Sequence, residues 1–253
     1  MIRKLVVSLL FVSCVWVQVT PAKDTSAKPV NILLVTGGCC HDYRFQTEAI
    51  QAAMKQSGVS SNWTVTNEGG DGTQAQIELY NDPHWADGFD VVIHNECFAD
   101  TTDVDYIRKI TAPHKSGVNA VVIHCAMHTY RSAEIDDWRE FLGVTSKRHD
   151  HQSHYKISVV EPRHPILKDF PVDHMSAMDE LYVIEKLWPT ATSLATSVSE
   201  KNGVTHPVFW TNQYGKARVF GTTFGHSSET FQDKAFLTAL VRGTLWAAGR
   251  LPE

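Results

Sequence analysis

Apolar residues form short, nearly continuous runs in the first half of the chain, and segments with helical spacing separate them. The runs cover residues 30–36, 63–66, 89–94 and 119–124. Runs of this kind are typical of strands buried on both faces of a sheet. Residues 45–57 carry apolar side chains at helical spacing and end at Gly58, and Asp103 can cap a second helix that extends to about residue 115. The alternation predicts a parallel sheet with right-handed crossovers.

The second half of the chain is less regular. Five further strands are expected there, at residues 155–160, 181–184, 193–198, 207–211 and 217–223. Residues 233–248 have the pattern of an amphipathic helix that ends at Gly249. No repeat, low-complexity block or flexible linker divides the sequence. We therefore expect one domain over residues 30–250, of α/β class: a three-layer open sandwich with a mostly parallel sheet and helices on both faces.

The N-terminus has a different pattern. Arg3 and Lys4 precede an apolar stretch over residues 5–19, and small residues follow at 20–22. This order is typical of a secretory signal peptide, and the stretch is short for a membrane span. We expect residues 1–22 to be removed, residues 23–29 to form a polar leader, and the protein to be exported to the periplasm or the extracellular space with no stable membrane span. An uncleaved anchor is the alternative.

Charge and cysteine content narrow the class of protein. The 253 residues include 23 Lys plus Arg and 28 Asp plus Glu, a formal charge of −5, which argues against a general affinity for nucleic acid. Removal of the signal would leave four cysteines, too few for a disulfide-stapled scaffold. Three states remain open for these cysteines: a disulfide from Cys39 or Cys40 to Cys97, thiolate metal ligation, or free packed thiols.

Histidine stands out, with 13 copies. Ligands of open parallel sheets bind beyond the carboxyl ends of the strands. Predicted strands end close to five histidines, which we expect to meet at one rim: His41, His94, His124, His128 and His226. For His149, His151 and His154 a solvated loop is expected, and an extended segment that places His149 and His151 on one side is the alternative. Loop or surface positions are expected for His84, His114, His164, His174 and His206.

Three chemistries fit such a rim. Neutral imidazoles of His124, His128 and His226, with a carboxylate such as Glu96 or Glu180, suit one divalent ion such as zinc, manganese or iron. Histidines with an acid partner can also transfer protons without a metal. Cys125 could act as a nucleophile just past a strand. The sequence lacks a phosphate loop and a complete GxGxxG motif, so we expect no nucleotide cofactor.

Aromatic and hydrogen-bonding side chains near the predicted rim indicate what it holds. Flat rings combined with bidentate polar groups are a common way to bind sugars. The candidates for binding substrate are Asn95, Glu96, Tyr130, Arg131, Tyr182 and Trp210. Packing in the core or at the rim is the alternative role for each of them.

Several motifs along the chain are recognisable: Thr36-Gly37-Gly38 with His41, residues 121–124 (VVIH), residues 179–182 (DELY), residues 207–226 and residues 243–249. Through these motifs the chain resembles the ThuA-like (trehalose utilisation) family. The resemblance implies a flavodoxin-like fold of the class I glutamine amidotransferase type without amidotransferase activity. It also implies a carbohydrate role, with 3-keto sugars among the substrates, and adds Gly38 to the candidates for binding substrate.

Together these observations predict an exported protein that acts on a small sugar, 3-keto sugars included, by proton transfer between histidines and an acid, with or without a metal. The predicted catalytic residues are His41, His124, His128, Glu180 and His226. A hydrolase that uses Cys125 and a sugar-binding module without turnover are the alternatives.

Overall fold

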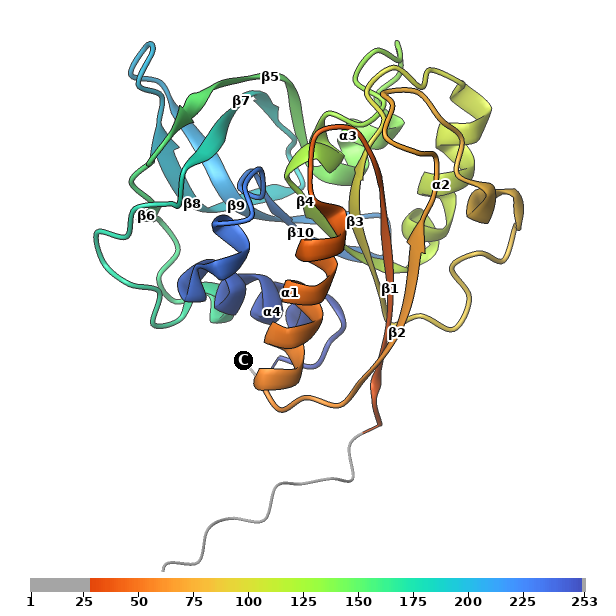
Figure 1. The fold of residues 1–253 in the computed structure, drawn as a ribbon, viewed down its shortest axis with the longest axis horizontal. Helices are drawn as coiled ribbons and strands as arrows, with labels where there is room; N and C mark the ends of the chain where they lie inside the picture. The colour runs from red at the N-terminus through yellow and green to blue at the C-terminus, as the bar shows by residue number, and fades with distance from the viewer. Residues whose placement is uncertain (1–27, 252–253) are drawn as a thin grey trace, which may run out of the picture.

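An eight-stranded sheet forms the centre of the chain in the computed structural model, which describes residues 28–251 (Figure 1). The strand order is β2-β1-β3-β4-β10-β9-β8-β6. Neighbours from β2 to β10 are parallel, and neighbours from β10 to β6 are antiparallel. The strands are β1 (Val30–Gly38), β2 (Ser61–Asn67), β3 (Val91–Cys97), β4 (Asn119–Ile123), β6 (Ser158–Val159), β8 (Ala191–Val198), β9 (Thr205–Tyr214) and β10 (Ala217–Thr222).

Helices cover both faces of this sheet. On one face, α1 (Tyr43–Gln56) and α4 (Lys234–Ala247) pack side chains such as Ile50 and Leu240 against one set of strand residues. On the other face, α2 (Val104–Ser116) and α3 (Asp137–Leu142) pack against the alternate set. The predicted three-layer α/β sandwich is confirmed. It forms because the apolar runs leave no polar face on the central strands, so that both faces need a cover.

A second, two-stranded sheet lies beyond the carboxyl ends of the parallel strands. It pairs β5 (Val144–Ser153) with β7 (Asp179–Leu187) in antiparallel register, and Gln152 lies opposite Glu180. The expected loop around His149 and His151 is therefore wrong, because these residues belong to β5. The strand expected at residues 155–160 is reduced to β6 and one isolated bridge between Lys156 and Met175.

Four single turns of 3-10 helix complete the described elements: η1 (Glu78–Asn81), η2 (His124–Met127), η3 (Pro165–Leu167) and η4 (Thr230–Gln232). Within residues 28–251, no helix is long and apolar enough to cross a membrane. The predicted signal peptide at residues 1–22 and residues 23–27 of the predicted leader lie outside the described residues.

Candidate functional site

Three histidines meet where β1, β4 and β10 end. His41 follows β1, His124 comes directly after β4, and His226 lies shortly after β10. The centroids of the three rings are 5.0, 5.1 and 5.5 Å apart. We refer to His41, His124 and His226 as the rim cluster. The structure thus brings together three of the five histidines that the sequence placed at this edge.

Hydrogen bonds fix the tautomers of two of these rings. The Nδ1–H group of His124 donates to the carbonyl oxygen of Thr223 at 2.6 Å, and that of His41 donates to the carbonyl of His226 at 3.2 Å. Each neutral ring therefore carries its lone pair on Nε2, which has no partner in His41 and faces the Tyr182 hydroxyl at 3.3 Å in His124. Burial lowers the pKa of His41 to about 4, and burial together with the neighbouring imidazoles holds the pKa of His124 well below its ordinary value. Both rings are accordingly neutral at neutral pH.

The Glu180 carboxylate lies among three imidazoles. Its Oε2 atom is 3.4 Å from Nδ1 of His226, 3.5 Å from Nδ1 of His149 and 3.7 Å from Nε2 of His124. The Glu180 side chain is 10% exposed and that of His149 is 39% exposed, so the group opens to solvent on the side of β5. This arrangement combines a carboxylate with rings that can accept, donate or pass on a proton.

The rim cluster also has the geometry of a metal site. One ring nitrogen from each of His41, His124 and His226 lies within 4.8 Å of the other two. Nε2 of His41 and Nδ1 of His226 are buried without a hydrogen-bond partner among the described residues. Buried polar atoms normally have partners, so two unpartnered imidazole nitrogens in one cluster indicate a place for a bound group, and Nε2 of His41 offers a lone pair to a cation.

The predicted metal set of His124, His128 and His226 differs from this one, because His128 is engaged elsewhere. Its Nε2 atom lies 3.0 Å from the Ser146 hydroxyl, and its Nδ1 atom accepts a hydrogen bond from Arg131 at 3.3 Å. The ring stacks on Tyr182 with centroids 3.8 Å apart. His128 therefore belongs to the layer beneath Tyr182, whose hydroxyl donates to Nε2 of His124 at 3.3 Å.

A tight turn carries His124 into the cluster. Its φ angle of 44° lies in the left-handed region, which costs a non-glycine residue about 1–3 kcal/mol. Gly225 packs against this turn: a Cβ atom there would lie 2.9 Å from Cβ of His124 and from Cγ2 of Ile123. Only glycine allows this close approach, which brings the segment with His226 onto the end of β4.

Buried polar side chains support the turn from below. Both carboxylate oxygens of Asp179 accept from the backbone N–H of His226 at 3.2 Å, and one accepts from Gly225 at 3.0 Å. Burial raises the pKa of Asp179 to about 7. Gln46 donates to the carbonyl of Gly225 at 3.0 Å and accepts from Asn95 at 2.8 Å. Asn95 thus supports the rim through Gln46 rather than facing a ligand.

Sequence reasoning missed Gln46, Gln152 and the part played by His149. Gln46 interrupts the otherwise apolar buried stripe of α1, and this was a signal that it has a buried polar partner. Gln152 lies with its amide nitrogen 2.8 Å from Nε2 of His226. No local pattern marked His149 and Gln152, because their position depends on how β5 pairs with β7.

His94 does not reach the rim. It is fully buried under α2 together with Glu96 and His114, and we refer to these three residues as the sealed cluster. Nδ1 of His94 is 2.8 Å from Oε1 of Glu96, and its Nε2 is 3.0 Å from Nε2 of His114. The expected placement of His94 and Glu96 at the rim is wrong, because alternate residues of β3 face opposite sides of the sheet. His94 and Glu96 face one side of the sheet, and Asn95 and Cys97 face the other.

The proton count of the sealed cluster follows from its bonds. Nδ1–H of His114 donates to the carbonyl of Val118 at 2.7 Å, so its Nε2 accepts from Nε2–H of His94. His94 and Glu96 then hold one proton between Nδ1 and Oε1. Burial and the neighbouring His94 lower the pKa of His114 to about 3, which keeps that ring neutral.

Several other residues that were expected to bind substrate are buried or engaged in hydrogen bonds. Trp210 is fully buried, and its indole N–H donates to the carbonyl of Leu142 at 2.8 Å. Tyr130 is buried, with 2% of its surface exposed. The backbone N–H of Gly38 donates to Gly70 at 2.8 Å, so it is already engaged. Arg131 is half-buried and orients His128.

Five histidines were expected in loops or on the surface, and the structure confirms three of these placements. His114 and His206 are buried in α2 and β9, so their expected loop or surface placement is wrong. His84 is exposed beside Asp87, as expected. His164 and His174 lie in the connections around η3, also as expected.

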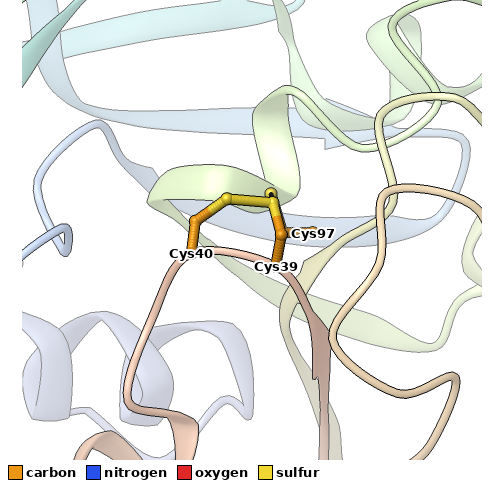
Figure 2. A group of neighbouring side chains, drawn as sticks. All are labelled: Cys39, Cys40 and Cys97. Carbon is orange, nitrogen blue, oxygen red and sulfur yellow. Dashed lines mark hydrogen bonds between the residues drawn. A yellow bond between two sulfur atoms is a disulfide. The ribbon is translucent and has the colours of Figure 1, made fainter.

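The four described cysteines form two disulfides, Cys39–Cys40 and Cys97–Cys125. The bridge from Cys39 or Cys40 to Cys97 that the sequence allowed is therefore not the pairing observed. Figure 2 shows the pair of neighbouring cysteines with Cys97 behind Cys39. Cys125 is 7% exposed and bonded, so it presents no free thiol in this state.

Solved structures share this fold. A ThuA-like protein from Parabacteroides merdae aligns with a TM-score of 0.69 at 20% identity, covering 89% of this chain and 92% of that one. A ThuA-like protein from Bacteroides uniformis aligns with a TM-score of 0.69 at 15% identity, covering 90% and 95%. A cytoplasmic protein from Salmonella typhimurium aligns with a TM-score of 0.54 at 12% identity, covering 85% and 97%.

Among curated proteins, no sequence match reaches significance. The family described as ThuA, trehalose utilisation, matches residues 31–247. This match includes the sheet from the second residue of β1 onward, both helical layers and the rim cluster. The chain therefore belongs to the ThuA family, whose fold is of the class I glutamine amidotransferase type.

Proposed function

We propose that the protein acts on a small sugar that carries a ketone, and that Glu180 transfers the proton. The observation that carries this proposal is the contact of one carboxylate oxygen with three imidazoles, at 3.4, 3.5 and 3.7 Å. A carboxylate in such a position can remove a proton from the carbon next to a carbonyl group. The family's description, trehalose utilisation, supports a sugar as the substrate.

The rim cluster supplies the stabilisation that this step needs. Proton removal leaves negative charge on the carbonyl oxygen as an enediolate, which requires a cation or a hydrogen-bond donor. The imidazoles of His41, His124 and His226 are arranged to hold a divalent ion that would act as the Lewis acid. Tyr182 holds His124 in place, and the half-exposed His149 gives Glu180 a route for exchanging protons with solvent.

Deuterium exchange tests the proposal directly. The protein is incubated in D₂O with a panel of glucosides and their 3-keto derivatives, and NMR follows the proton next to the carbonyl. We expect exchange only with the keto sugars. Glu180→Gln should slow it by about 10²–10⁴-fold, because the carboxylate base is lost while the shape is kept.

The matched control is Glu185→Gln, on the same strand but exposed, which should leave the exchange rate unchanged. Equal rates for wild type and Glu180→Gln would contradict the role of Glu180. Sugar binding without any exchange would instead favour the non-catalytic sugar-binding module. Full activity of Cys125→Ser would exclude the cysteine hydrolase.

We also propose that the protein is exported. The charged, apolar and small-residue pattern of residues 1–22 supports this, and disulfides are favoured in oxidising compartments. N-terminal sequencing of the protein from the cell envelope or medium should begin at Lys23. A protein that begins at Met1 and remains in the cytoplasm would contradict export.

A further inference from the structure

The two disulfides lie against each other at the carboxyl ends of β1 and β3. Sγ of Cys39 is 3.8 Å from Sγ of Cys97, although each belongs to a different disulfide. Cys40 is exposed and Cys39 half-buried, whereas Cys97 and Cys125 are only 3% and 7% exposed. The four sulfurs therefore form a short path from solvent into the protein, as Figure 2 shows for Cys40, Cys39 and Cys97.

We propose that these four cysteines form a thiol–disulfide exchange site whose partner is a dithiol. The dithiol reacts at the exposed Cys40, and Cys39 passes the exchange to the buried Cys97–Cys125 disulfide. The proposal concerns sulfur chemistry and does not depend on the sugar-directed function.

The sheet, rather than a free loop, builds the contact between the two disulfides. Gly38 pairs with Cys97 in the register of β1 and β3. A Cβ atom at Gly38 would lie 2.2 Å from the carbonyl oxygen of Cys97, so the two backbones approach as closely as glycine permits. Tyr43 donates its hydroxyl hydrogen to the carbonyl of Cys39 at 2.9 Å and holds the segment after β1. Cys39 is thus positioned beside Cys97.

The exchange balances in three steps. A thiolate of the dithiol attacks Sγ of Cys40, the Cys39–Cys40 bond breaks, and Cys39 leaves as a thiolate. The second thiol of the reductant then displaces Cys40, which takes a proton, and the reductant departs as a disulfide. The Cys39 thiolate attacks Sγ of Cys97, so that a Cys39–Cys97 bond forms and the Cys97–Cys125 bond breaks. Cys125 leaves as a thiolate and takes a proton.

The path ends beside the rim cluster. Cys40 directly precedes His41, and Cys125 directly follows His124. Each original disulfide therefore restrains a residue next to one of these histidines, and the exchange removes both restraints together. Such coupling gives a chemical reason for placing two disulfides at this edge of the sheet.

Limiting reduction tests the proposal. The oxidised full chain receives one equivalent of dithiothreitol, N-ethylmaleimide then blocks free thiols, and trypsin digestion without further reductant precedes mass spectrometry. Arg108 and Lys115 separate Cys97 from Cys125 in the digest, and Lys23 separates Cys14 from Cys39. We expect a peptide pair joined through Cys39 and Cys97, with label on Cys40 and Cys125.

Two single variants separate transfer from independent reduction. Cys39→Ser removes the relaying sulfur, so labelling of Cys125 under limiting dithiothreitol should slow by at least about tenfold. Cys40→Ser leaves a Cys39 thiol beside Cys97, so the Cys39–Cys97 link and label on Cys125 should form without any reductant. Thermal melting of both variants shows that each is folded.

Three results would overturn the proposal. They are wild-type protein labelled at Cys39 and Cys40 with Cys97–Cys125 intact, a Cys39→Ser variant that labels Cys125 as fast as wild type, and a folded Cys40→Ser variant that keeps Cys97–Cys125. None of these measurements uses sugar turnover, so failure here is distinct from failure of the proposed function.

Discussion

Two groups of histidines lie in this protein, and they differ in how their ring nitrogens are used. In the sealed cluster, both nitrogens of His94 and of His114 have partners at 3.0 Å or less. In the rim cluster, His41 and His226 each keep a buried nitrogen without a partner in the part of the chain that the structure describes. Both groups contain buried imidazoles, yet every ring nitrogen has a partner in one group and not in the other.

This difference shows what separates a structural histidine from a candidate functional one. A buried imidazole that satisfies its neighbours stabilises the fold, and its removal leaves unpaired groups behind. A buried imidazole nitrogen that lacks a partner gains by binding a cation or a substrate. Histidine content alone therefore carries no functional information here, whereas the partner of each nitrogen does.

The largest effect is expected from opening the sealed cluster. His94→Ala leaves Oε1 of Glu96 and Nε2 of His114 without this partner and creates a cavity, so we expect a loss of about 3–5 kcal/mol in the free energy of unfolding. Thermal melting should then fall by roughly 10 °C. Bound metal per folded molecule should not change. An unchanged free energy of unfolding would contradict the structural role of the sealed cluster.

Removing a rim histidine should act in the opposite way. His41→Ala takes one candidate ligand away, so we expect zinc affinity to fall by at least about 10–100-fold, with little change in melting temperature. Elemental analysis and zinc titration measure this. His128→Ala is the matched control, because both its nitrogens are engaged elsewhere, and it should keep the metal. Loss of metal in His128→Ala alone would restore the ligand set predicted from sequence.

The smallest expected effect concerns pH. Burial lowers the pKa of His114 to about 3 from an unfolded value of 6.5, so below pH 6.5 the unfolded chain binds a proton that the folded protein does not. The stability contributed by neutral His114 is therefore present above pH 6.5 and is lost as pH falls toward 3. Denaturant unfolding measures the free energy of unfolding at each pH. Between pH 4 and 6, the slope of this free energy against pH should be smaller by about one proton in His114→Gln than in wild type. An equal slope would show that His114 is charged in the folded protein.

Much of the fold followed from local patterns. The continuous apolar runs of β1, β3 and β4 require a sheet that is covered on both faces, and the glycines at the end of β1 marked the edge at which ligands of such sheets generally bind. Convergence of His41, His124 and His226 followed from parallel strands sharing one edge. The direction of a side chain at a strand end did not follow from the local pattern. For this reason the sequence placed His94 at the rim.

Other features had no local signal. His149 and Gln152 reach the rim because β5 pairs with β7, two strands separated by 25 residues that include β6 and η3. The cysteine pairing depends on where the segment after β1 folds, and neighbouring cysteines bonded to each other could not be inferred from spacing. Gln46 lies between these cases, because its place in an apolar stripe was visible but its partners were not.

The sequence by itself determined the α/β class, the rim and the histidines that follow strands, because periodicity and chain order set which ends of parallel strands meet. Only the tertiary structure decided which imidazole nitrogens have partners, that Glu180 lies among three rings, and that two disulfides touch. The physical reason is the separation along the chain of the residues on which each property depends. Periodicity is a property of neighbours along the chain, whereas hydrogen-bond satisfaction depends on atoms that long-range packing brings together.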